Sequence, residues 1–358
     1  IIPNNTIISG TNYTAYGKNL RVKSAGNLNT QPLNNLIIAD EVIVEAGGTF
    51  QIENNSNLVQ INNATNTGNI IYKRIAANIK GSDYVYWSSP VNNQAISSFY
   101  TSPAQGPKYS WNTLANNGNG ASGNISQGNW ENPPAIMANG SGYIIRGSSS
   151  FGMAATNISS TFTGRPNNGT ISVPIYRGDY TGSVYPGANG VPINNLDDNY
   201  NLIGNPYPSA INALQFLSEN PSIEKNVKLW KHGIDAVNGA TNPFYGSFAY
   251  NYSGSDYVTI NFTGSTTPTS SDIIKSGQAF FVEMLDGATG SGTVNFNNTI
   301  RRDGSGSPYL NDNFFRNSNQ QTTSFDNIER HRIWLDIVDA NNIAETTLLG
   351  YVSGATVA

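Results

Sequence analysis

YNLIGNPYPSAINALQFL, residues 200–217, is the stretch around which the chain is organised, because a weaker copy, YVYWSSPVNNQAISSF, stands at residues 84–99. In both stretches a tyrosine opens an apolar run that closes on two small or polar residues and a proline. The closing triplets are Ser88-Ser89-Pro90 and Gly204-Asn205-Pro206. The repeat predicts one structural module present twice, and it favours a building block over a single catalytic centre.

Further landmarks follow in the same order in both copies. Trp111 corresponds to Trp230, at an offset of 230 − 111 = 119 residues. GSGYII at 140–145 corresponds to GQAFFV at 277–282, and FTG at 162–164 to FNN at 296–298. Together with apolar alternation in strand-like runs such as DYVTINF at 256–262, this order predicts two related β-sandwich or jelly-roll-like modules. The one helix that the pattern predicts runs over 209–217, with Ser209 as its N-cap.

Composition indicates a secreted, turn-rich β protein. Charged residues make up 12% of the 358 residues, against a norm of about 25%, while Asn, Gly, Ser and Thr are abundant. The chain has no cysteine, which excludes disulfides and thiolate chemistry. A net charge of −4 without a basic stripe argues against a nucleic-acid partner. Apolar runs all fall short of the roughly 20 residues that a membrane helix needs.

The first part of the chain, 1–72, predicts a short β-solenoid-like tract. Short apolar runs recur at near-even spacing, as in Val42-Ile43-Val44 and Phe50-Gln51-Ile52, with a Gly47-Gly48 turn between them. Coils of this kind bury one apolar face against the next, and a bare end needs a cap or another coil. The edge of an ordinary β-sandwich fits the same pattern, so both interpretations stay open here. A solenoid would be consistent with further coils upstream in an intact protein.

The remaining boundaries follow from composition. Module one is expected over 73–190 and module two over 191–302. The last part, 303–358, is expected to be a polar linker (303–327) and a C-terminal hairpin, with strands at 332–337 and 347–352 about a turn at 339–342. Because a lone hairpin is marginal in water, it must pack on module two or belong to a further domain. The abrupt close after a strand-like run suggests a fragment cut from a longer chain.

At these residues the sequence resembles a family of large, often adhesin-like surface proteins of Bacteroidota that are exported by the type 9 secretion system. The stretches that carry the resemblance are YVYWSSPV (84–91), NLIGNPYPSAINALQFL (201–217), KSGQAFFVE (275–283), RHRIWLDI (331–338 ends with it) and LLGYVSGAT (348–356). The resemblance implies an extracellular, outer-membrane-associated location, with the secretion machinery or other cell-surface components as partners. It also implies surface display or adhesion, and it supplies no catalytic motif. Glycans and self-association are further partners that this class allows.

Motifs for chemistry are sparse. His232 and His331 have no metal-ligand spacing, and no nucleophile elbow or phosphate-binding loop occurs. A glycosidase needs two facing carboxylates, and sequence alone cannot pair the candidates. These are Glu131, Asp197, Asp198, Glu219 and Glu283. We therefore expect a non-enzymatic protein.

Two binding hypotheses remain. Calcium prefers clustered hard oxygen ligands, which Asp336, Asp339, Asn341 and Asn342, or Asp197, Asp198 and Asn199, could supply, although solvated turns explain the same residues.

Sugar binding is the second hypothesis, since an aromatic face with nearby amides suits a glycan. Trp130, with Asn129 and Asn132, is the candidate surface because it has a loop-like context. Trp87, Trp111, Trp230 and Trp334 lie in strand-like runs typical of a core. We expect a cell-surface adhesion or structural stalk protein without a required cofactor. The alternative is a carbohydrate-binding module or carbohydrate-active enzyme.

Overall fold

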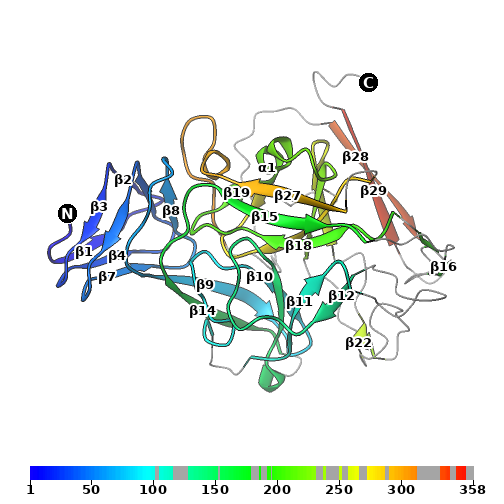
Figure 1. Cartoon of the computed structure of the whole chain (residues 1–358), viewed down its shortest axis with the longest axis horizontal. Helices are drawn as coiled ribbons and strands as arrows, with labels where there is room; N and C mark the ends of the chain where they lie inside the picture. The colour runs from blue at the N-terminus through cyan, green and yellow to red at the C-terminus, as the bar shows by residue number, and fades with distance from the viewer. Residues whose placement is uncertain are drawn as a thin grey trace.

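The computed structural model of the chain is all-β, with a β-solenoid of about three turns followed by further sheets (Figure 1), which confirms the predicted fold class. The structure describes residues 1–100, 105–115, 128–151, 154–178, 185–186, 192–194, 196–230, 237–238, 250–251, 257–265, 272–286, 290–312, 331–338 and 344–351.

The solenoid consists of three parallel ladders of short strands. Its strands are β1 (Asn5–Ile8), β2 (Thr14–Gly17), β3 (Leu20–Val22), β4 (Asn27–Thr30), β5 (Asn35–Ile38), β6 (Val42–Val44), β7 (Thr49–Ile52) and β8 (Asn57–Gln60). The ladders are β1-β4-β7, β2-β5-β8 and β3-β6. Asn5 pairs with Asn27 and Asn27 with Thr49, so one coil takes 27 − 5 = 22 residues. This geometry decides for the solenoid over a sandwich edge.

Each coil buries its inward side chains on those of the next. Leu28 lies beside Phe50, and Leu20 beside Val42, and all four are buried. At one position polar side chains also form a ladder, because the Asn57 amide donates to the Asn35 carbonyl oxygen at 2.7 Å. The expected alternation of apolar and polar residues is therefore what closes the coils.

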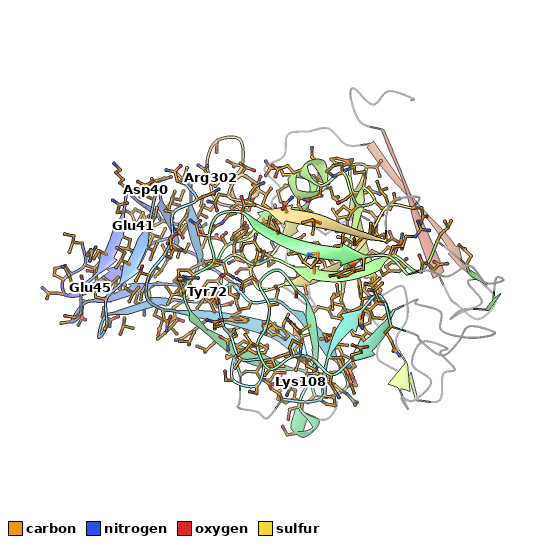
Figure 2. All side chains as sticks on the ribbon, in the orientation of Figure 1. Asp40, Glu41, Glu45, Tyr72, Lys108 and Arg302 are labelled. Carbon is orange, nitrogen blue, oxygen red and sulfur yellow. The ribbon has the colours of Figure 1, made fainter. Side chains whose placement is uncertain are left out.

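The solenoid continues into module one through a shared strand. β9 (Ile70–Ile79) pairs in parallel with β7 and in antiparallel fashion with β14 (Thr156–Gly164). Strand β9 therefore runs across the expected boundary at residue 72. Figure 2 shows Tyr72 of this strand where the solenoid meets the rest of the molecule, with Glu45 toward the far end of the solenoid.

The two modules contain sheets of matching strand order. Module one has β10 (Tyr84–Trp87), β11 (Lys108–Asn112), β12 (Asn129–Glu131) and β13 (Tyr143–Arg146), in the order β10-β13-β11-β12. Module two has β18 (Tyr200–Gly204), β20 (Asn226–Trp230), β23 (Tyr257–Asn261), β24 (Gly264–Ser265) and β26 (Ala279–Glu283), in the order β18-β26-β20-β23-β24. In both, the first strand pairs with the last and the last with the second. The shared order confirms that the two modules are related.

A long antiparallel pair accompanies each sheet. In module one this is β9 with β14, and in module two it is β15 (Ile171–Tyr176) with β27 (Ser291–Phe296). The sequence boundaries placed 171–176 in module one. Strand pairing instead assigns these residues to module two, because their partner strand lies more than a hundred residues downstream and no local pattern marks it.

The helix begins later than predicted. α1 spans Ala213–Glu219, and its N-cap is Asn212, whose side chain accepts a hydrogen bond from the Gln215 amide at 2.8 Å. Ser209 is instead completely buried and accepts a bond from Arg301. Local sequence offered both residues as caps, and the tertiary partner of Ser209 decided between them.

The described part of the expected linker, 303–312, packs against the solenoid and module two. The Asn311 side chain is fully buried and donates to the Ser56 carbonyl and to the Tyr72 hydroxyl, both at 2.8 Å. This part of the prediction was wrong, because its polar residues satisfy buried groups instead of facing water. Beyond it, β28 (His331–Val338) and β29 (Ala344–Tyr351) form the predicted antiparallel hairpin, and its turn lies outside the described residues.

The smaller elements complete the described fold. They are β16 (Tyr185–Pro186), β17 (Pro192–Ile193), β19 (Ile211–Asn212), β21 (Val237–Asn238), β22 (Tyr250–Asn251), β25 (Ile273–Ile274), and the 3-10 turns η1 (Ser149–Phe151) and η5 (Thr299–Arg301). Within the described ranges no helix is long and apolar enough to cross a membrane.

Candidate functional site

The sheets of the two modules meet through aromatic side chains. Cross-strand partners Trp111 and Trp130 pack edge to face at 5.1 Å between ring centroids, and the equivalent partners Trp230 and Tyr257 pack at 4.9 Å. Both pairs belong to one cluster of rings that spans the modules. We call this cluster the aromatic seam, and it consists of Tyr86, Trp111, Trp130, Trp230, Tyr257 and Phe281.

Tyr86 is the centre of the aromatic seam. Its ring stacks on Trp230 at 5.5 Å with an interplanar angle of 12°, and its hydroxyl lies 2.6 Å from the hydroxyl of Tyr257. Edge-to-face contacts to Trp130 and Phe281 complete the surroundings. Rings in such contact contribute about 0.5–1.5 kcal/mol per pair beyond the area that they bury. The aromatic seam therefore joins the two modules.

Trp130 does not have the loop context that the sequence suggested. It lies in β12, is half-buried, and packs on three other rings of the aromatic seam. Asn129 precedes it in the same strand and so projects to the opposite face, while Asn132 follows the strand and is exposed. The three residues of the proposed glycan surface therefore do not converge on one face.

Backbone contacts at the base of the aromatic seam are reciprocal. The Ser88 amide donates to the Gly277 carbonyl, and the Gly204 amide donates to the Gly140 carbonyl, each at 2.8 Å. In the sequence repeat Ser88 corresponds to Gly204, and Gly140 to Gly277. Contacts that recur with the partners exchanged are the signature of an approximate two-fold axis. The two modules are thus related by such an axis.

The modules differ at the polar edge of the aromatic seam. Lys228 donates to Glu283 and to the Tyr200 hydroxyl, both at 2.7 Å, and Asn226 donates to the second Glu283 oxygen at 3.1 Å. Burial by itself raises the pKa of Glu283, but Lys228, Tyr200 and Asn226 together outweigh it and hold this pKa below its usual value. The carboxylate is therefore engaged as an ion pair. At the equivalent place in module one, Arg146 pairs across the strands with Tyr84.

The other candidate carboxylates also have partners. Asp198 accepts from Arg177 at 3.3 Å, and Arg177 also bridges to Asp286 at 3.0 Å. The guanidinium of Arg177 therefore supplies the positive charge beside Asp198, where calcium was considered. Asp197 accepts from the Asn194 amide, Glu131 from Asn112, and Glu219 from Thr299.

Metal ligands do not gather in the described part of the chain, where no group of three or more His, Asp or Glu side chains could hold an ion. Of the calcium candidates, Asp336 lies in β28, while Asp339, Asn341 and Asn342 lie outside the described residues. Of the histidines, His331 begins β28 and His232 lies outside the described residues.

Two buried arginines join the solenoid to module two, and the sequence analysis missed both. Arg301 is completely buried and donates to the Leu58 carbonyl of the solenoid at 2.6 Å, to Ser209 at 2.8 Å and to Asn298 at 2.8 Å. Its guanidinium also lies over the Tyr207 ring at 4.4 Å. Burial lowers the pKa of Arg301 to about 10. Five donors in a fixed fork allow one side chain to hold several segments at once.

Arg74 forms the second joint. It is also completely buried, and it donates to Ser276 of module two at 3.1 Å, to Asn54 of the solenoid at 3.0 Å and to the Asp312 carbonyl at 2.9 Å. Beside it, Lys275 forms a buried ion pair with the Asp312 side chain. Alternation along β9 places Arg74 on the inward face, so the pattern Ile70, Tyr72, Arg74 was a signal that could have revealed it.

Comparisons with known proteins identify one family. A family model described as "Domain of unknown function (DUF8693)" matches residues 1–358. Neither the curated proteins nor the solved structures contain a significant match to the chain.

Proposed function

The chain belongs to the family that it matches over its full length, a domain of unknown function, and we propose that it is a non-enzymatic, load-bearing stalk segment of a cell-surface adhesion protein. The observation that carries this proposal is the joint between the solenoid and the modules. Arg301 and Arg74 each bond the solenoid on one side and module two on the other.

This joint is the opposite of a hinge. Domains that move against each other are connected by exposed linkers crossed by few contacts. Here β9 extends the solenoid sheet into module one, and one apolar core runs through both. Strands β1 to β3 and the hairpin β28–β29 lie at opposite ends of the long axis (Figure 1). A force applied along that axis is therefore transmitted through paired strands and buried polar contacts.

Two further features support a place at the cell surface. The low content of charged residues suits an exported β protein, and the stretches at 201–217 and 275–283 resemble adhesin-like exported proteins. The role as a structural segment also agrees with the state of Glu283 and Asp198, which are engaged in ion pairs.

Single-molecule pulling tests the load-bearing role. Because the chain has no cysteine, Lys18→Cys and Ser218→Cys provide unique attachment points on exposed residues of the solenoid and of α1. We expect one rupture in which the solenoid and the modules unfold together. The Arg301→Met variant should separate this into two events, whereas Arg21→Met, at an exposed ion pair, should not.

A separate low-force event that releases the solenoid from the unmodified joint would contradict the proposal. The alternative role, carbohydrate binding, is checked on a glycan array. Specific binding that Asn132→Ala abolishes, without a change in stability, would replace the stalk with a carbohydrate-binding module, because Asn132 is exposed and its loss should not disturb the aromatic seam.

A further inference from the structure

The solenoid has an open end. Strands β1 and β2 are each terminal in their ladders, so in the described part of the chain each pairs along one side only. Their other sides present backbone donors and acceptors in a row. Such edges are templates for another strand, and proteins usually blunt them with charge, proline or a covering segment.

Large apolar side chains gather at this end. Ile7 of β1 is 65% exposed and Tyr16 of β2 is 73% exposed. In the ladder that contains Tyr16, the next two positions are Ile37 and Val59, and these are only 3% and 0% exposed. The first coil therefore exposes positions that are buried in later coils.

Ile2 already occupies part of the next ring. It forms a parallel bridge with Val22, its amide donates to the Arg21 carbonyl at 2.8 Å, and its carbonyl accepts from the Lys23 amide at 3.0 Å. These are the bonds that a strand of a preceding coil makes to β3. The register is the one that links successive coils further along.

The corner of the first coil is shaped for the same neighbour. A Cβ atom on Gly26 would lie 2.3 Å from the Ile2 carbonyl oxygen, just as one on Gly48, 22 residues later, would lie 2.6 Å from the Lys23 carbonyl oxygen. Both contacts are shorter than real Cβ atoms tolerate. Glycine at this corner therefore permits the close approach of the coil before it.

We propose that the open end of the solenoid is a docking surface for one further parallel coil of the same 22-residue repeat. The occupant places strands beside β1 and β2 and covers Ile7 and Tyr16, while Ile1 and Ile2 complete its third side. Its inward residues are apolar, like Leu28 and Leu36 of the second coil. The proposal concerns this end alone and holds whether or not the chain bears load.

A fusion tests the proposal in register. A copy of 27–42 joined directly ahead of Ile1 lets Ile1 and Ile2 take the places of Ile43 and Val44 in the added coil. Hydrogen exchange of the amides in β1, β2 and β3 is then compared with that of the unfused chain. We expect exchange to slow about tenfold or more when strands cover these edges.

The matched control carries the same copy with its Leu28, Leu36 and Ile38 replaced by Asp, and it should give no added protection. Equal exchange in the fusion and its control would overturn the proposal. So would a dimer of the unfused chain, detected by light scattering, that already protects β1 and β2, because the occupant would then be a second copy.

Discussion

Arg301 concentrates more of the architecture in one side chain than any other residue of the polar joints. It is fully buried, and its bonds go to neutral groups, namely carbonyl, hydroxyl and amide oxygens. Removing a guanidinium charge from water is costly, and only a complete set of acceptors offsets that cost. The joint is therefore sensitive to the geometry of the fork as well as to its charge.

Arg301→Lys should lower the free energy of unfolding by about 2–4 kcal/mol, because an ammonium cannot reach all the acceptors and leaves buried oxygens without donors. Urea denaturation measures the change. Arg21→Lys is the matched control, since Arg21 forms an exposed ion pair with Glu45. That control should change stability by less than about 0.5 kcal/mol. Equal effects in both variants would contradict the role given to Arg301.

Glu283 should make stability depend on pH. Its pKa in the folded chain lies below the ordinary value of 4.5, so its contribution is fully present above pH 4.5 and is lost as the pH falls through the folded pKa. We expect Glu283→Gln to be less stable than the wild type at pH 7, with a gap that narrows below pH 4.5. Chemical denaturation at pH 7 and pH 3 measures it, with Glu131→Gln as an exposed control. A gap of constant size would count against this account.

At the scale of elements, the approximate two-fold axis depends on strands that cross at small residues. A Cβ atom on Gly204 would lie 2.4 Å from the Cβ of Ser88 and 3.0 Å from the Cα of Ala279. The crossing of β18 over the end of β10 therefore leaves no room for a side chain. Spacing between the two sheets is set here, and the aromatic seam fits that spacing.

Gly204→Ala should destabilise the fold by about 1–3 kcal/mol, since the strands must move apart in a packed core. Gly304→Ala is the control, because no atom lies within 4 Å of the added Cβ there. Thermal unfolding of both variants checks the prediction. A melting temperature for Gly204→Ala equal to that of Gly304→Ala would show that the crossing can relax.

Elements marked by strong local patterns were predictable from the sequence. The repeat was visible because prolines and aromatic residues recur in order, as at Pro90 and Pro206, and the solenoid because Val42 and Phe50 begin alternating runs. Features set by distant partners were not. Asn311 looks like a linker residue until Tyr72 and Ser56 surround it, and Trp130 looks exposed until the rings of module two cover it.

At the scale of the whole molecule, solenoid and module one share a core. We expect them to unfold in one step, although chains of this length commonly unfold in several. All five tryptophans lie outside 1–72, so their fluorescence reports on the modules, while pulse proteolysis reports on the solenoid. The two urea transitions should coincide. Cleavage of the solenoid at a lower urea concentration than the fluorescence change would contradict a shared core.

The reciprocal contacts of Ser88 with Gly277 and of Gly204 with Gly140 have a historical consequence. A chain with a single module would leave its ring-bearing face wet, and the natural remedy is a homodimer of two identical polypeptides. Joining the two genes fixes the stoichiometry and frees each half to diverge. Divergence is visible where one half keeps Arg146 and the other Glu283, a difference of sign that identical subunits could never display.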